Sequence, residues 1–264
     1  MSSKSVFVGA DVGASRTKVA VLDAEKTLVG WAVKRSGTDF SATAQTCLEL
    51  SLNNAGAEKS DIAGAISTGY GRKNVSYAAE SKTEIGCHAK GCFFYFPFAT
   101  TIIDIGGQDN KIIKIDDRGL RTNFKMNRKC AAGTGAFLEE MAMRLDVSIE
   151  EMDALARRSE NMVKLGSFCT VFSATEVLEN IRQGKTLPDI VKGVFYSMVK
   201  RVLEMDALTE KVVMTGGVVA HNPYLVKMTE EIIGRKILVP DYPQLTGAIG
   251  AALYAMESKE KVKG

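Results

Sequence analysis

The sequence predicts an α/β protein built from two similar lobes. One turn-containing segment occurs twice: residues 11–23 align without gaps with residues 104–116, and the Asp, Gly, Lys and final Asp of the two copies coincide. Around these copies, short apolar runs alternate with longer segments of helical periodicity, which is the pattern of an α/β fold. We therefore predict an N-terminal lobe at residues 1–98 and a C-terminal lobe at 99–264, with the last helix a candidate to pack back on the first lobe.

Each copy of the repeat is predicted to be a β-hairpin. An apolar run (6–12 or 101–105) leads into a small-residue turn after Asp-x-Gly, and alternating apolar residues follow as far as the final Asp. The first lobe is expected to continue with a strand at 27–34, a helix at 41–55, a strand at 62–67 and helical segments to about residue 96.

The second lobe is predicted to be richer in helices, at 135–145, 173–181 and 189–205. Apolar pairs recur between Ile190 and Leu203, which indicates a helix buried on one face. A strand at 211–215, a helix at 223–233, a strand at 236–239 and a closing helix at 247–256 complete the expected order.

Composition excludes several classes of protein. The 264 residues are 45% hydrophobic and 25% charged, which is ordinary for a globular chain. The net charge of +3 is small and the two signs are mixed, so neither a nucleic acid nor an anionic membrane is an expected partner. Because the N-terminus lacks a signal-peptide core and no apolar run reaches membrane-spanning length, we expect the protein in the cytoplasm. There the five irregularly spaced cysteines are free thiols or metal ligands.

The two hairpin turns have the composition of phosphate-binding loops. Glycines allow backbone N–H groups to converge on a phosphate, while hydroxyls and a lysine add donors and charge. Two facing turns would hold the β- and γ-phosphates of one nucleotide. The candidate residues are Asp11, Gly13, Ala14, Ser15, Arg16, Thr17 and Lys18 in the first copy and Gly106, Gly107 and Gln108 in the second.

Carboxylates stand at the end of the first strand in each copy. Asp11 and Asp104 are placed to hold Mg²⁺ through water molecules, because Mg²⁺ keeps most of its hydration shell. Asp104, Gln108 and Asp109 are the candidate catalytic residues, with Gln108 or Asp109 positioning the water that attacks the γ-phosphate. The alternative for both is ordinary turn chemistry. Lys18 and the equivalent lysine of the second copy either serve the phosphate site or lie on a solvated strand face.

A third glycine turn follows the strand at 211–215. Gly216, Gly217 and Val218 precede a helix, as expected for a backbone surface against adenosine. One such turn alone is most often a simple tight turn, but three in this order, two of them duplicates, are a stronger signal.

The order of these motifs resembles the actin, sugar-kinase and Hsp70 ATPase superfamily, whose lobes are ribonuclease H-like. A closer resemblance is to the ATP-dependent activators (component A) of 2-hydroxyacyl-CoA dehydratases and benzoyl-CoA reductases, the BadF/BadG/BcrA/BcrD ATPase family. It covers nearly the whole chain and rests on these motifs: Gly-Ala-Asp11-Val-Gly13, Thr68-Gly-Tyr-Gly-Arg72, Cys87-His-Ala, Ile-Asp104-Ile-Gly-Gly-Gln108-Asp109, Lys129-Cys130-Ala-Ala-Gly-Thr-Gly135, Cys169-Thr-Val-Phe172 and Pro243-Gln244 through Gly247-Ala-Ile-Gly250.

The resemblance implies an actin-like ATPase that binds ATP or ADP with Mg²⁺, with Gln244 and Gly247 on the nucleotide side. It implies a homodimer in which Cys130 and Cys169 of each subunit hold one shared four-iron four-sulfur cluster. Electrons would come from ferredoxin or flavodoxin and pass singly to a partner acyl-CoA dehydratase or reductase.

The residues themselves agree with this ligand set. A cluster of this kind takes four thiolates, and Cys130 and Cys169 both directly precede predicted helices. The positive end of a helix favours a thiolate. The segment Ser173-Ala-Thr-Glu176, which follows Cys169, has the form of a capping box.

The other cysteines and two departures from the family pattern carry separate expectations. Cys47 lies in an amphipathic pattern and is expected in the core. Cys87 and Cys92, with a histidine between them, are either ligands or, as their spacing favours, structural thiols. Ala174 stands where relatives carry an acid, and Arg16 adds a cation to the first turn; each leaves the branch of the family open.

Two other classes of function remain open at this stage. A small-molecule kinase, such as a sugar kinase, would have the same phosphate turns and no need of cluster cysteines. A nucleotide-gated scaffold or chaperone would hydrolyse ATP slowly and bind a protein client.

Overall fold

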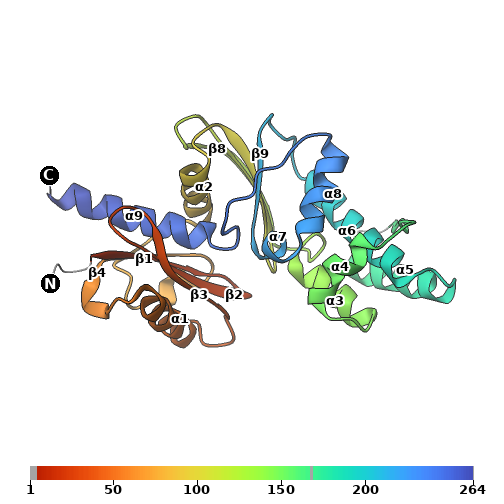
Figure 1. The fold of residues 1–264 in the computed structure, drawn as a ribbon, viewed down its shortest axis with the longest axis horizontal. Coiled ribbons are helices and arrows are strands. Elements are labelled where there is room, and N and C mark those ends of the chain that lie inside the picture. Colours follow the sequence, from red (N-terminus) through yellow and green to blue (C-terminus); the bar gives the residue numbers. More distant parts are fainter. Residues whose placement is uncertain (1–4, 167–168, 264) are drawn as a thin grey trace. The chain divides into compact units, whose positions relative to one another are not determined.

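A computed structural model of the protein describes residues 5–166 and 169–263. The chain divides into two compact units, each an α/β arrangement around one sheet (Figure 1). Unit 1 comprises residues up to 99, 115–122 and 245 onward, and unit 2 comprises residues 100–114 and 123–244. Relative to the predicted division at residue 98, unit 1 also includes the segment 115–122 and the last helix.

The sheet of unit 1 has five strands in the order β3-β2-β1-β4-β5. These are β1 (Val6–Val12), β2 (Arg16–Leu22), β3 (Leu28–Arg35), β4 (Ile62–Thr68) and β5 (Glu80–Ser81). β1 is antiparallel to β2 and parallel to β4. Every residue of β1 is buried, because helices cover both faces of the sheet.

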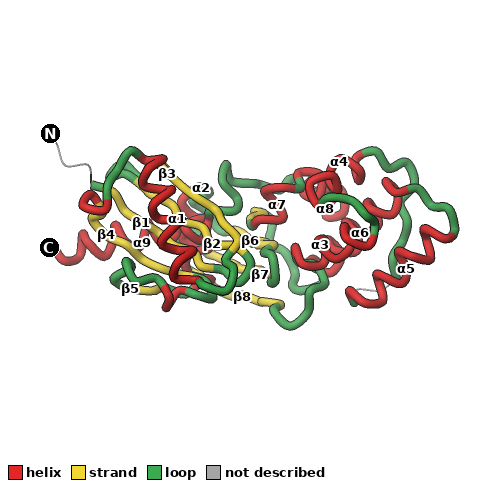
Figure 2. The backbone as a smooth tube through the Cα atoms, turned by 90° about the horizontal axis from the view of Figure 1, so that it is seen from below, coloured by secondary structure: helices red, strands yellow, loops and turns green. Residues whose placement is uncertain are grey.

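The helices of unit 1 take alternate side chains of β1. α1 (Phe40–Ala55) lies over the face of the sheet that is turned to the viewer in Figure 2, and α9 (Thr246–Lys263) packs on the other face. Val8 belongs to the core formed with α1, whereas Phe7 belongs to the core formed with α9. α2 (Glu84–Tyr95) packs along α9. This packing is close, because a Cβ added to Gly250 would lie 1.8 Å from the carbonyl oxygen of Cys87. Two 3₁₀ turns, Lys59–Asp61 and Arg72–Asn74, complete the unit.

The second sheet has the order β8-β7-β6-β9 and repeats the order β3-β2-β1-β4 of the first. Its strands are β6 (Thr100–Ile105), β7 (Asn110–Ile115), β8 (Arg121–Asn127) and β9 (Val212–Thr215), and β9 is parallel to β6. The predicted repeat is therefore a repeat of strand topology as well as of sequence.

The helices of unit 2 form one large apolar core with the second sheet. They are α3 (Gly135–Arg144), α4 (Met152–Arg157), α5 (Thr170–Arg182), α6 (Leu187–Leu203), α7 (Gly217–His221) and α8 (Pro223–Ile233), with a 3₁₀ turn at Ile149–Glu151. α6 carries the predicted buried stripe, and it begins at Leu187 because Thr186 caps it by accepting the N–H of Asp189.

Three details differ from the sequence prediction. The strand predicted at 236–239 is only a single bridge between Leu238 and Val213, because Pro240 offers no N–H to extend the pairing. The capping box predicted at Ser173 is wrong: α5 begins at Thr170 with Cys169 as its N-cap. β5, β8, α4 and α7 were not predicted. Among the described residues, no helix is both long and apolar enough to cross a membrane.

Candidate functional site

The first hairpin joins a buried carboxylate to a lysine across its two strands. Asp11 of β1 lies opposite Lys18 of β2, and Lys18 Nζ donates to Asp11 Oδ2 at 3.0 Å. The connecting turn is closed by the N–H of Gly13, which donates to the carbonyl oxygen of Arg16 at 3.1 Å. Glycine suits this position because a Cβ there would lie 2.9 Å from the same oxygen.

The second hairpin repeats this geometry at the equivalent positions, which lie 93 residues further along the chain. Lys111 Nζ donates to Asp104 Oδ2 at 3.1 Å, and the N–H of Gly106 donates to the carbonyl oxygen of Asp109 at 2.9 Å. Lys111 also donates to Asp109 Oδ1 at 2.7 Å and is only 2% exposed. The alternative that Lys111 lies on a solvated strand face is therefore wrong.

The duplication extends to the neighbouring parallel strands. Thr68 of β4 lies opposite Asp11, and Thr215 of β9 lies opposite Asp104. Each threonine precedes a glycine with positive φ, 88° at Gly69 and 103° at Gly216, a backbone conformation that disfavours residues with a Cβ. The Thr-Gly dipeptide is a signal that would have extended the repeat from sequence alone.

The two aspartates nevertheless differ in their hydrogen bonds. Thr215 donates to Asp104 Oδ1 at 2.9 Å, so both oxygens of Asp104 are engaged. Thr68 donates instead to the carbonyl oxygen of Lys82, and Asp11 Oδ1 has no hydrogen-bond partner among the described residues although Asp11 is buried. A buried carboxylate oxygen without a hydrogen-bond partner is unusual in a folded protein.

The side chains of the first turn divide into two groups. Ala14 and Arg16 are exposed and Ser15 is half-buried, so these residues form the open surface of the turn. Thr17 is buried and its hydroxyl pairs with Ser36, which in turn donates to the carbonyl oxygen of Gly13 at 2.6 Å. Thr17 thus supports the turn from beneath. Ser36 was not predicted, and nothing in its local sequence distinguishes it.

The second turn presents a different set of groups. Gln108 is exposed and makes no hydrogen bond to another described residue, whereas Asp109 is tied to Lys111. The carbonyl oxygens of Gly106 and Gly107 accept the N–H groups of Gly135 and Ala136 at 2.9 and 2.7 Å. The first turn of α3 is therefore hydrogen-bonded directly to the second phosphate turn.

The third glycine turn lies within unit 2. A Cβ on Gly216 would lie 2.3 Å from the carbonyl oxygen of Ile105, so the turn packs tightly on β6. Gly217 opens α7, and a Cβ on it would lie 3.1 Å from Nε2 of Gln244, which brings two predicted nucleotide-binding residues together. Val218 is buried beside them.

Gly247 is placed elsewhere, in unit 1. It lies in the first turn of α9, and a Cβ on it would lie 3.1 Å from Asp11 Oδ2 and 3.2 Å from Nε2 of His88. His88 is buried and pairs through Nδ1 with the hydroxyl of Thr246 at 3.3 Å. The surroundings of Asp11 thus come from β1, β2, β4, α2 and α9.

The five cysteines, all of which are described, separate by exposure. Cys47, Cys87 and Cys92 are buried, and Cys130 and Cys169 are exposed. Burial raises the pKa of Cys47 to about 11 and that of Cys87 to about 12, which disfavours the thiolate that binds a metal. Among the described residues, no group of three or more His, Cys, Asp or Glu side chains is arranged to hold a metal ion within one chain.

The two exposed cysteines occupy defined backbone positions. The carbonyl oxygen of Cys130 accepts from Asn127 Nδ2 at 3.0 Å, and the N–H of Cys130 donates to Asn127 Oδ1 at 3.3 Å. Cys169 is the N-cap of α5, as predicted from its position before a helix. Ala174, one of the two departures from the family pattern, is buried in this helix, and the other, Arg16, is exposed.

An exposed apolar stripe follows Cys169 along α5. Val171, Leu178 and Ile181 recur at helical spacing and are 71%, 51% and 45% exposed, and Phe172 beside them is 65% exposed. A stripe of this kind next to a thiol is a feature of interaction surfaces.

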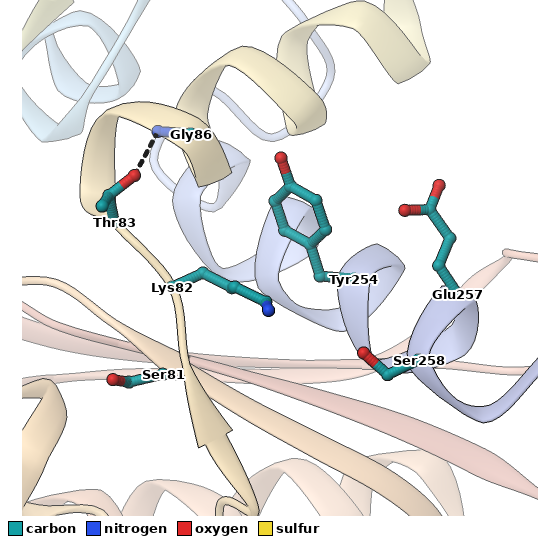
Figure 3. Close-up of a pocket in the computed structure, with 7 residues that line it drawn as sticks. All are labelled: Ser81, Lys82, Thr83, Gly86, Tyr254, Glu257 and Ser258. Carbon is teal, nitrogen blue, oxygen red and sulfur yellow. Dashed lines mark hydrogen bonds between the residues drawn. The ribbon is translucent and has the colours of Figure 1, made fainter. Parts of the chain in front are cut away.

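Unit 1 also contains a pocket whose lining includes none of the predicted site residues (Figure 3). It is lined by residues 81–83 and Gly86 and by Tyr254, Glu257 and Ser258 of α9. None of these residues belongs to the phosphate turns or the cysteine segments.

Comparison with known proteins gives a consistent result. The model of the BadF/BadG/BcrA/BcrD ATPase family matches residues 8–255. The chain is 42% identical over 257 residues to the activator of lactoyl-CoA dehydratase from Anaerotignum propionicum, covering 96% of this chain and 98% of that one.

Two solved structures are similar in fold and sequence. Component A of (R)-2-hydroxyglutaryl-CoA dehydratase from Acidaminococcus fermentans matches with a TM-score of 0.92 and 38% identity, over 97% of this chain and 99% of that one. The activator of 2-hydroxyisocaproyl-CoA dehydratase from Clostridium difficile, with bound ADPNP, matches with a TM-score of 0.91 and 39% identity, over 98% and 97%. The predicted actin-like α/β fold is confirmed.

Proposed function

The chain belongs to the BadF/BadG/BcrA/BcrD ATPase family, and from this premise we propose that it is a homodimeric iron–sulfur ATPase. It couples ATP binding and hydrolysis to the transfer of single electrons into a partner acyl-CoA dehydratase or reductase. The observation that carries the proposal is that, of five cysteines, the two at the cluster motif of the family are exposed and the other three are buried.

The residues around Asp11 fit Mg²⁺ and nucleotide. Asp11 Oδ1 is a buried oxygen without a hydrogen-bond partner in the described chain, so a Mg²⁺-bound water would satisfy it. Both oxygens of Asp104 are engaged by Lys111 and Thr215, which makes Asp11 the better candidate of the two predicted Mg²⁺ carboxylates. An ADPNP-bound relative at 39% identity supports ATP or ADP as the nucleotide.

The roles proposed in hydrolysis depend on which side chains of the second turn are already hydrogen-bonded to other described residues. Gln108 is exposed on the second turn and would orient the attacking water, whereas Asp109 is held by Lys111 and would fix the shape of the turn. Lys18 would offset phosphate charge. Gly216, Gly217 and Gln244 would provide the adenosine surface.

Cys130 and Cys169 fit a four-iron four-sulfur cluster shared by two subunits. Each is exposed, each precedes a helix, and two subunits supply the four thiolates that such a cluster takes. When bound, the cluster supplies low-potential one-electron transfer. The apolar stripe of α5 (Val171, Phe172, Leu178 and Ile181) would lie against the second subunit or the partner enzyme and shield the thiols from water.

Few residues separate the proposed phosphate turn of unit 2 from the thiol of Cys130. Gly106 and Gly107 of the second phosphate turn hold the first amides of α3, and Cys130 lies five residues before that helix. A turn that closes on a γ-phosphate would therefore shift the Cys130 segment, which is how nucleotide state would control electron transfer. Ferredoxin or flavodoxin would supply the electron, in the cytoplasm.

The test is anaerobic purification of the wild type and of Cys130→Ser and Cys169→Ser variants. The wild type should be a brown dimer with about two irons per chain, since one cluster of four irons serves two chains. Each variant should lose the iron and the colour and still bind ATP. Retention of full iron content by both variants would refute the ligand assignment.

A matched control is Cys92→Ser, which changes the same atom at a buried thiol and should leave the iron content unchanged. The kinase alternative is tested on the same samples. ATP hydrolysis should be independent of added sugars, and transfer of phosphate to a sugar hydroxyl by the iron-free chain would favour the kinase instead.

A further inference from the structure

Asn110 is the buried polar side chain whose position the proposed function leaves unexplained. It is the first residue of β7, directly after the second phosphate turn, and its side chain is completely buried. Neither Nδ2 nor Oδ1 has a hydrogen-bond partner among the described residues. An unpaired buried amide is energetically unfavourable, so its presence at this position calls for an explanation.

The equivalent residue of the first hairpin shows what a purely structural group does at this position. In the alignment of the two copies, Asn110 is at the position equivalent to Thr17. The Thr17 hydroxyl pairs with Ser36 at 2.9 Å, and Ser36 closes the bond onto the turn at Gly13. The turn of the first hairpin is thus held by Ser36, which follows β3, whereas no described residue makes an equivalent bond with the side chain of Asn110.

The side chain of Asn110 lies close to the segment that carries Cys130. A Cβ on Gly133 would lie 2.8 Å from Asn110 Nδ2, which is too short a contact for any residue with a Cβ, and Gly133 also has a φ of 80°. Gly133 lies three residues after Cys130, and the amide group of Asn110 therefore faces the backbone of the cysteine loop, residues 130–134.

The cysteine loop is anchored at its two ends, and between them the N–H and hydroxyl of Thr134 both donate to the carbonyl oxygen of Ala131, at 2.9 and 2.6 Å. At one end Asn127 binds both backbone groups of Cys130, and at the other Gly135 and Ala136 donate to the second phosphate turn. Because the second anchor is the phosphate turn itself, a displacement of that turn moves the loop relative to Asn110.

We propose that Asn110 is a positioning residue that forms hydrogen bonds to the backbone of the cysteine loop in one nucleotide state and releases them in the other. The proposal rests on the proposed function in that the loop carries Cys130. It adds the specific side chain through which the second phosphate turn and the cysteine loop are coupled, and it assigns this coupling to the second hairpin and not the first.

The test is hydrogen–deuterium exchange of the amides of residues 131–136 in the full chain, purified anaerobically, at saturating ADP and at a saturating non-hydrolysable ATP analogue. In the wild type, exchange in this loop should differ between the two nucleotides by about fivefold or more, the lower range of typical coupling between sites. In Asn110→Leu, which keeps the volume and removes the hydrogen-bonding groups, the difference should fall to within about twofold.

Asn54→Leu is the matched control, because it makes the same change at an asparagine of α1 in unit 1, outside the phosphate turns. It removes the amide whose Nδ2 donates to the carbonyl oxygen of Trp31 at 3.0 Å and should leave the nucleotide response of residues 131–136 intact. If Asn110→Leu does not fold, Asn110→Ala removes the same groups with less bulk and should give the same loss of response.

Two outcomes would overturn the proposal: no nucleotide-dependent exchange in the wild-type loop, or an undiminished response in the Asn110 variants. Neither depends on the iron content, which is measured separately on the same samples. A chain without iron that keeps an Asn110-dependent response would refute the cluster assignment and leave this coupling standing.

Discussion

Replacement of Lys111 by methionine tests how much the buried ion pair of the second hairpin contributes to folding. Lys111 is 2% exposed and binds Asp104 at 3.1 Å and Asp109 at 2.7 Å. Methionine keeps most of the volume but leaves the buried Asp104 carboxylate with Thr215 as its hydroxyl donor. Breaking a buried pair from one side typically costs about 3–5 kcal/mol, so Lys111→Met should lower the free energy of unfolding by about that amount.

The first hairpin provides the internal comparison. Lys18 makes the same pair with Asp11, but its side chain is 17% exposed. Water can therefore partly take the place of the lysine ammonium group when Lys18 is replaced. We expect Lys18→Met to cost about 1–3 kcal/mol, less than the Lys111 variant. The measurement is denaturant unfolding followed by circular dichroism at pH 7.

A double variant separates charge from packing. Lys111→Met with Asp104→Asn removes both buried charges and should recover at least half of the lost stability. A loss below about 1 kcal/mol for Lys111→Met, or no recovery in the double variant, would refute the reasoning.

Three further predictions concern packing, a capping carboxylate and the buried thiols. Gly250→Ala should lower the free energy of unfolding by at least about 3 kcal/mol, because the added Cβ would lie 1.8 Å from the backbone oxygen of Cys87. The pKa of Asp189 is lowered, mainly by the hydrogen bond from Ser159. The ionised carboxylate therefore stabilises the fold above the ordinary pKa of 3.8, and this stabilisation is lost as pH falls below that value. Asp189→Asn should lower the melting temperature at pH 7, and the difference from the wild type should shrink in acid. Burial holds the pKa of Cys47 at about 11 and that of Cys87 at about 12, so at pH 8 iodoacetamide should modify only the two exposed cysteines of the iron-free folded chain, as read by mass spectrometry.

Each of these predictions has a control. Gly166→Ala adds the same methyl group 3.8 Å from its nearest neighbour and should be nearly neutral, so equal losses at the two glycines would contradict the packing argument. A constant difference between Asp189→Asn and the wild type from pH 7 to pH 3 would contradict the role of the carboxylate. Rapid modification of the buried thiols in folded protein would contradict their placement, and modification after unfolding shows that the reagent is competent.

Much of the candidate site was predictable because its signal is local and duplicated. The gap-free match of residues 11–18 to 104–111 predicted two hairpins, and both have the same Asp–Lys pair and the same turn closure. The helix positions followed from apolar periodicity and, at Thr186, from a cap. The strand predicted at 236–239 is reduced to one bridge because Pro240, which follows the apolar run, has no N–H to extend the pairing.

The sequence by itself determined that the chain has two related lobes, three glycine turns and two cysteines placed before helices, because each is encoded within a few consecutive residues. Only the tertiary structure decided how the duplicates diverge. Thr215 donates to Asp104 Oδ1 across 111 residues of sequence, whereas the equivalent oxygen of Asp11 has no partner among the described residues. Ser36 donates to the turn of the first hairpin, whereas Asn110 has no hydrogen-bond partner among the described residues of the second. Burial and hydrogen-bond partners depend on residues distant in the chain, so identical local motifs acquire different chemistry when each lobe folds around them.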